Sequence, residues 1–294
     1  MKSIVKIVLL ASFALVFASC EDVVQIKLDE GSGLYVIDAF INSSRTDQVV
    51  KITNNSSYFS NSQPSGISGA SVILTDLTEN RQFVFNYTSN GNYVYTLAAN
   101  DTIAKINHNY SLSVVIDGVP YTSSTTQKRS ASIDSIGVEL NDNNFFGGGS
   151  SSDTTYLCTL YAKDKADAQT DYYWVKTFRN DTLFSAPEDL NVNIDGTGGA
   201  ITNPPSDSLD FTPPSTLLGF RKYKRHDRCK VEVHSIMFDT YNFLTQAQVQ
   251  INNGGLFATT PENVKTNLVT PSGKTKAVGW FSVASVATKS IQVR

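Results

Sequence analysis

Histidine and cysteine are scarce in this 294-residue chain, which holds three of each. None of the histidines (His108, His226 and His234) has the spacing of a metal-binding pair, and no Gly-x-Ser-x-Gly elbow or phosphate-binding loop occurs. These absences predict a protein that is not an enzyme and that uses no metal or cofactor. Asn191–Gly196 resembles the start of a calcium loop, but Thr202 stands where the closing glutamate belongs, so an Asx-rich turn is the preferred interpretation.

Charge is also sparse, because Asp, Glu, Lys and Arg together make up 17% of the chain and the formal net charge is −3. That mild acidity gives no reason to expect nucleic acid as a partner. Aromatic and β-branched residues are plentiful, with 13 Tyr and 16 Phe, which is typical of exported β-structure. After the first 17 residues, no apolar run approaches the length of a membrane span.

The first 19 residues have the layout of a secretory signal: two lysines, an apolar run over residues 7–17, then Ala18 and Ser19. The run is too short to remain as a transmembrane helix. Ala-Ser-Cys resembles the lipobox of bacterial lipoproteins, in which the cysteine thiol takes a diacylglycerol. We therefore predict that residues 1–19 are a lipoprotein signal peptide and that Cys20 carries palmitate-type acyl chains as a membrane anchor. The alternative is an ordinary signal peptide with an unrelated cysteine.

Two acidic residues, Glu21 and Asp22, follow the cysteine directly. Acids in this place resemble the signal that sends Bacteroidota lipoproteins to the outer face of the outer membrane. The alternative is that they are part of a merely polar tether, which we place at residues 20–33 because it ends in Glu-Gly-Ser-Gly.

Residues 34–128 show short strand-like runs separated by turns. Phe83, Phe85 and Tyr87 alternate with other residues, as expected of one face of a pleated sheet, and Asn90-Gly91 is a good hairpin turn. Six or seven strands over this length predict a β-sandwich of immunoglobulin or transthyretin type.

A polar stretch at residues 125–132 is a plausible linker, so a second, mostly β domain is expected at residues 129–294. Within it, residues 239–252 have helical spacing, with Asp239 as a cap and Gly254-Gly255 as a stop. The expected buried face of this helix comprises Tyr241, Leu244, Ala247 or Gln248, and Ile251. A long loop at about 185–216 is expected to bind something or to be disordered.

Three further groups of residues attract attention. Cys158 and Cys229 could form a disulfide outside the cytoplasm, or they could be two separate buried thiols. Six cations lie close together in the sequence: Arg221, Lys222, Lys224, Arg225, Arg228 and Lys230. They could form a contact patch that binds lipopolysaccharide phosphates or an acidic partner. The alternative is a solvated hairpin. Five Asp-Ser/Thr tripeptides resemble Bacteroidota O-glycosylation sequons, although they are also common turn chemistry; the acceptors would be Thr102, Ser135, Thr154, Thr182 and Ser208.

Several stretches together resemble the Bacteroidota outer-membrane lipoproteins of the domain-of-unknown-function 4249 family. They are "CEDVVQIKL", "LYVIDAFI", "GASVILTD", "YVYTL", "IDSIGVEL", "DYYWVK", "VEVHSIMFDTYNFLTQ", "GLFATTPENVKTNL" and "AVGWFSV". The resemblance implies a lipid-anchored, non-enzymatic binding or accessory subunit of a TonB-dependent receptor at the outer membrane, facing the cell surface. It carries over no catalytic residues. The alternative function is that of a surface adhesin or structural envelope lipoprotein.

Overall fold

The computed structural model describes residues 33–56, 62–99, 101–141, 154–163, 170–194, 208–209, 221–253 and 264–294. The predicted signal peptide, Cys20, Glu21 and Asp22 lie outside these residues. Strands dominate the described chain and a single α-helix accompanies them, which confirms the predicted fold class. None of the described helices is long and apolar enough to cross a membrane.

The N-terminal part forms seven strands, which is the upper end of the predicted number. They are β1 (Tyr35–Asn42), β2 (Gln48–Asn54), β3 (Ser71–Asp76), β4 (Arg81–Ser89), β5 (Asn92–Tyr95), β6 (Asn109–Ile116) and β7 (Val119–Thr126). Their residues alternate between buried and exposed positions, so each strand places one apolar face toward a common core. The turn at Asn90 and Gly91 has positive φ at both residues, as predicted for a two-residue hairpin.

The second part forms strands β8 to β14 and the long strand β15. They are β8 (Ser132–Leu140), β9 (Tyr156–Lys163), β10 (Tyr172–Arg179), β11 (Thr182–Leu183), β12 (Asn191–Ile194), β13 (Ser208–Leu209), β14 (Arg228–Ile236) and β15 (Ala277–Gln292). In the described chain, β13, β9 and β8 make a three-stranded sheet, and the other strands join one large sheet in the order β11-β10-β14-β15-β1-β2-β5-β4-β3-β6-β7, with β12 on β10.

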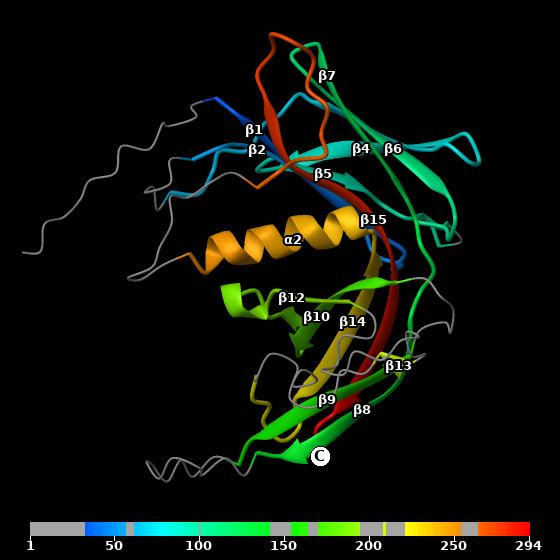
Figure 1. The fold of residues 1–294 in the computed structure, drawn as a ribbon, viewed down its shortest axis with the longest axis vertical. Helices are drawn as coiled ribbons and strands as arrows, with labels where there is room; N and C mark the ends of the chain where they lie inside the picture. Colours follow the sequence, from blue (N-terminus) through cyan, green and yellow to red (C-terminus); the bar gives the residue numbers. More distant parts are fainter. Residues whose placement is uncertain are drawn as a thin grey trace, which may run out of the picture. The chain divides into compact units, whose positions relative to one another are not determined.

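Strand β15 ties the two parts together (Figure 1). It pairs in parallel with β1, from Tyr35 opposite Ala277 onward, and antiparallel with β14, from Ser235 opposite Ser285 onward. Its first half supplies Phe281 to the core of the N-terminal strands. Residues 277–284, which were assigned to the second domain, therefore add a strand to the sheet of the N-terminal part, while the boundary at 128/129 stays a prediction.

Three groups of buried residues make up the interior. The first lies within β1 to β7 and the start of β15, with Phe83, Tyr93 and Tyr110 among its largest members. The second lies where β8 and β9 pack on β10 and β14, around Tyr173 and Tyr223. The third lies beneath the helix.

Helix α2 (Phe238–Ile251) lies close to its predicted position, but two details of the prediction were wrong. The N-cap is Met237, so Asp239 belongs to the first turn, where a carboxylate is favoured by the helix dipole. The buried helical residues are Thr240 and Leu244, whereas Ile251 is half exposed. The helix therefore buries a polar threonine as well as an apolar leucine.

The predicted linker is fastened to its neighbours. Strand β7 continues to Thr126, Gln127 is fully buried, and the Arg129 guanidinium pairs with the carboxylate of buried Asp171. The loop expected at 185–216 is also partly regular: a 3-10 turn, η2, covers Pro187–Asp189, and β12 pairs with β10 where an Asx-rich turn was expected. Both stretches are polar because they bond to other segments, which a sequence pattern does not reveal.

Candidate functional site

The cationic segment at residues 221–230 is anchored through its centre. Tyr223 is fully buried in the core around β9 and β14 and exchanges backbone hydrogen bonds with Tyr156. Asp227 closes the following turn by accepting the Lys224 amide. The segment is thus a fixed surface feature with a buried aromatic anchor.

Half of its cations face acids of the same chain. Arg221 lies 2.6 Å from Asp189 and 3.1 Å from Glu188, Arg228 pairs with Asp181, and Lys230 lies 3.1 Å from Glu232. Lys222, Lys224 and Arg225 have exposed side chains. Acids of the same chain therefore neutralise at least three of the six cations, and the contact patch stays a prediction.

The two cysteines come together. Cys158 on β9 and Cys229 on β14 are both buried in the same core, and their thiols hydrogen-bond to each other; both are free thiols in this structure. The hydrogen bond to Cys229 and burial raise the pKa of the Cys158 thiol, which disfavours the reactive thiolate. The structure thus has two buried, unbonded thiols, and a disulfide between them stays a prediction.

The predicted glycosylation acceptors are accessible where they are described. Thr102, Ser135, Thr154 and Thr182 are exposed, and the side chain of Ser208 lies outside the described atoms. Their aspartates differ, because Asp101 is held by Arg81 at 2.6 Å whereas Asp134 is about half exposed. Modification itself stays a prediction.

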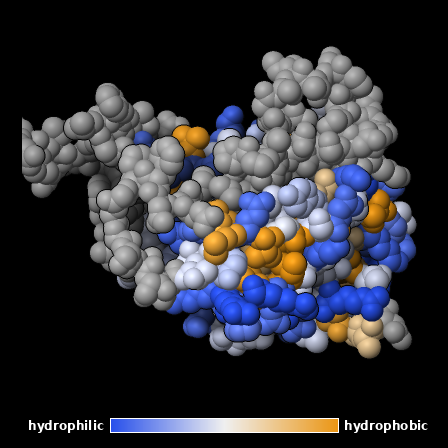
Figure 2. All heavy atoms as spheres, turned by 90° about the horizontal axis from the view of Figure 1, so that it is seen from below, coloured by the Kyte–Doolittle hydropathy of each residue, from blue (hydrophilic) through white to orange (hydrophobic). Residues whose placement is uncertain are grey.

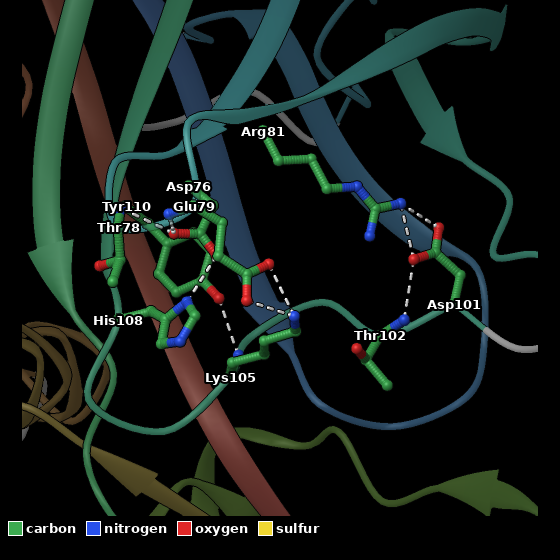
Figure 3. Close-up of polar contacts among 9 residues, drawn as sticks. All are labelled: Asp76, Thr78, Glu79, Arg81, Asp101, Thr102, Lys105, His108 and Tyr110. Atoms are coloured by element: carbon green, nitrogen blue, oxygen red, sulfur yellow. Dashed lines mark hydrogen bonds and ion pairs between the residues drawn. The ribbon is translucent and has the colours of Figure 1, made fainter.

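A polar cluster that the sequence analysis missed lies at one end of the sandwich (Figure 3). Asp76, the last residue of β3, accepts the amides of Thr78 and Glu79 through Oδ1, at 2.9 and 3.1 Å. Its Oδ2 lies 2.7 Å from Nδ1 of His108, which precedes β6. Burial raises the pKa of Asp76, but the hydrogen bonds from His108 and the two amides outweigh it and bring the pKa below its ordinary value.

Two ion pairs flank this histidine–aspartate contact. The Lys105 ammonium lies 2.6 Å from both carboxylate oxygens of Glu79. Arg81 and the Tyr95 hydroxyl both bond to Asp101, at 2.6 and 2.8 Å. The backbone amide of Lys105 donates to the Tyr110 hydroxyl at 2.7 Å, which fixes the loop that carries the lysine.

Asp76, Glu79 and His108 can each direct one ligand atom into a common space, since these atoms lie within 4.8 Å of one another. Carboxylates and imidazole are the side chains that bind divalent cations. No sequence pattern predicts this group, because His108 lies far along the chain from both acids and meets them through the pairing of β3 with β6.

A second polar group lies beneath the helix, on the face of β10 and β14. Burial lowers the pKa of His234 to about 4, although its 3.2 Å contact with Glu232 opposes the shift. Burial also lowers the pKa of Lys176 to about 8, and its Nζ lies 3.8 Å from the centre of the Trp174 ring. Buried His234 has the structural role that its alternating position in a strand predicted.

A family model described as "Domain of unknown function (DUF4249)" matches residues 21–290 of the chain. No curated protein matches the sequence significantly. Among solved structures, a DUF4785 family protein from Legionella pneumophila is similar at 9% identity and a TM-score of 0.21, over 67% of this chain and 51% of that one. A 1.5-MDa bacterial ice-binding adhesin is similar at 15% identity and a TM-score of 0.18, over 88% of this chain and 63% of the other.

The chain thus spans about half of the first of these structures and under two thirds of the second. At such TM-scores the likeness carries no information about function. The family match is the comparison that bears on identity: it begins at the residue after Cys20 and covers all but the last four of the described residues.

Proposed function

This chain belongs to the DUF4249 family, and on that premise we propose that it is a lipid-anchored outer-membrane protein that faces the cell surface and serves a TonB-dependent uptake receptor as a non-enzymatic binding or accessory subunit. The proposal assigns Cys20 to the lipid and Glu21 with Asp22 to export. It assigns binding to the β-rich body.

The observation that carries the proposal is the short stretch of sequence between Cys20 and the body. The family match begins at residue 21, directly after the cysteine, and strand β1 begins at Tyr35. A 14-residue segment such as residues 21–34 can span at most about 50 Å. An acylated Cys20 would therefore keep the body within reach of a receptor in the same membrane, where the effective concentration of a partner is high.

Exposed apolar side chains could form the contact surface for a protein partner. Figure 2 shows apolar residues gathered in the middle of one face of the molecule, with hydrophilic residues around them. On the outer hairpin of the smaller sheet, Leu140 and Tyr161 are 51% and 50% exposed. Apolar and aromatic residues with a polar rim are typical of protein–protein contacts.

Affinity purification tests the receptor assignment. A tag inserted at the Asp117-Gly118 turn leaves the body intact, because there is open space around Gly118. After mild detergent extraction, an outer-membrane receptor should copurify with the tagged chain and be absent with the Cys20→Ala variant. Recovery of no receptor would contradict the proposal. Binding to cells or matrix that persists after deletion of neighbouring transporter genes would favour an adhesin instead.

Protease treatment of intact cells tests the anchor and the export signal separately. Cys20→Ala should leave the protein unlipidated and away from the surface. The double change Glu21→Ala and Asp22→Ala should keep the lipid but prevent digestion, because two acids add almost nothing to membrane affinity and act only by being recognised. Full digestion of the double variant would exclude the acidic signal while leaving the lipid anchor standing.

A further inference from the structure

Asp76, Glu79 and His108 are positioned by backbone that is already rigid. Asp76 ends β3, and its register partners are Arg81 on β4 and Tyr110 on β6. Glu79 lies in the tight β3–β4 turn, which Asn80 closes with a positive φ of 52°. Ligands carried by paired strands and a closed turn keep their spacing, which is what a binding site requires.

Within this cluster, Glu79 is the carboxylate that already pairs with a cation. One oxygen of Asp76 is used by turn amides, so the other is directed at His108. Both oxygens of Glu79 are held by the Lys105 ammonium at 2.6 Å (Figure 3). Glu79 is 41% and Lys105 35% exposed, so the cluster opens to solvent on the side of this pair.

We propose that Asp76, Glu79 and His108 form a binding site for a divalent transition-metal ion of the Zn²⁺ type, and that the ion displaces the Lys105 ammonium from Glu79. The ligands are Oδ2 of Asp76, Nδ1 of His108 and one carboxylate oxygen of Glu79. Water completes a tetrahedral set. A ring nitrogen among three ligands favours Zn²⁺ over Ca²⁺ or Mg²⁺, which prefer all-oxygen sites.

The exchange balances in charge and protons. Two carboxylates and one ammonium give the cluster a charge of −1, and two carboxylates with a divalent ion give zero once the ammonium has moved into solvent. When Nδ1 of His108 binds the ion, the ring keeps one proton, on Nε2. No redox partner is needed.

The geometric change is small. Zn²⁺ at about 2.0–2.2 Å from both atoms of a tetrahedral site separates them by about 3.4 Å. The present Oδ2–Nδ1 distance is 2.7 Å, so these two side chains must open by roughly 0.7 Å. The Glu79 oxygen, now within 4.8 Å of both atoms, must come to a similar distance from them.

Titration of the purified, chelator-treated full mature chain with ZnCl₂ tests the proposal, with Co²⁺ absorption as a report of coordination geometry. The wild-type chain should bind one equivalent. Glu79→Gln and His108→Ala should each weaken binding by about 100-fold or more. Lys105→Gln should tighten it about fivefold, because the competing ammonium is gone. His226→Ala is the matched control, since this histidine is exposed and distant in sequence, and it should change nothing.

A purely structural cluster of ion pairs gives the opposite results. If neither the wild-type chain nor Lys105→Gln binds a stoichiometric ion, the site does not exist. If His226→Ala loses binding and His108→Ala keeps it, the ion is adventitious. Far-ultraviolet circular dichroism checks that each variant is folded, and Glu79→Gln remains informative if His108→Ala is not, because the Glu79 side chain is exposed.

Discussion

The N-terminal sandwich and the second part of the chain are both β-structure, but they are stabilised in different ways. In the sandwich, buried polar side chains such as Gln48 and Thr53 carry no charge, and the buried carboxylate of Asp76 lies at a strand end beside partners that solvent reaches. In the second part, buried His234 and Asp171 lie within the structure and depend on particular partners. We therefore expect the stability of the sandwich to fall mainly when buried side-chain volume is removed. The stability of the second part should fall when a buried ion pair is broken or when the pH changes.

The largest effect is expected from Phe281→Ala on the shared strand β15. The side chain is fully buried, so its loss should lower the free energy of unfolding by about 3–5 kcal/mol in urea titrations. Val269→Ala, at a 64% exposed position, is the control and should cost under about 0.5 kcal/mol. Because β15 also pairs with β14, amide exchange should quicken in β14; unchanged protection there would mean that the two parts unfold independently.

The next effect concerns the former linker. Asp171→Ala leaves the Arg129 guanidinium without its carboxylate, and both side chains are largely buried, at 6% and 18% exposure. Stability should fall by about 2–3 kcal/mol, measured by thermal unfolding. Asp134→Ala removes the exposed pair with Lys163 and should cost at most about 1 kcal/mol. If both variants lose the same free energy of unfolding, burial does not set the contribution of these ion pairs.

A pH dependence should follow from His234. Its pKa of about 4 in the folded chain lies below the unfolded value of about 6.5, so protonation favours the unfolded state. This contribution is fully present above pH 6.5 and is lost as the pH falls toward 4. Unfolding experiments should show a loss of about 2 kcal/mol between pH 7.5 and pH 5.

His234→Asn should flatten that slope. His226→Asn is the matched control, because His226 is exposed and asparagine tolerates its positive φ of 72°. A slope that persists in His234→Asn would assign the acid sensitivity to other groups.

The smallest effect is expected beneath the helix. The Thr240 hydroxyl accepts the Trp280 indole N–H at 3.0 Å and donates to the Ser282 hydroxyl at 3.1 Å, all in the interior. Thr240→Val should cost about 1–1.5 kcal/mol because the indole donor loses its acceptor. Thr245→Val, which removes only a bond to a carbonyl of the same helix, should be nearly neutral. A loss of similar size in both would point to helix propensity instead.

Most elements of the fold could be predicted from local pattern. Alternating apolar residues predicted the strands β1 to β7, and the Asn-Gly pair, which tolerates positive φ, predicted the turn at Asn90-Gly91. Helical spacing of apolar residues predicted α2 to within one residue at each end. Tyr223 illustrates what could not be predicted, since it stands among cations and yet is fully buried. A local pattern cannot report which distant segment will cover a residue.

The same distinction between local and distant contacts applies to the candidate site. The sequence by itself determined the β-rich class, the signal-like N-terminus and the position of the one described α-helix, because these depend on neighbours within a few residues. Only the tertiary structure decided that β15 joins both parts, that Cys158 meets Cys229, and that His108 meets Asp76 and Glu79. Strand pairing between remote segments creates these contacts, and its register is a property of the whole sheet.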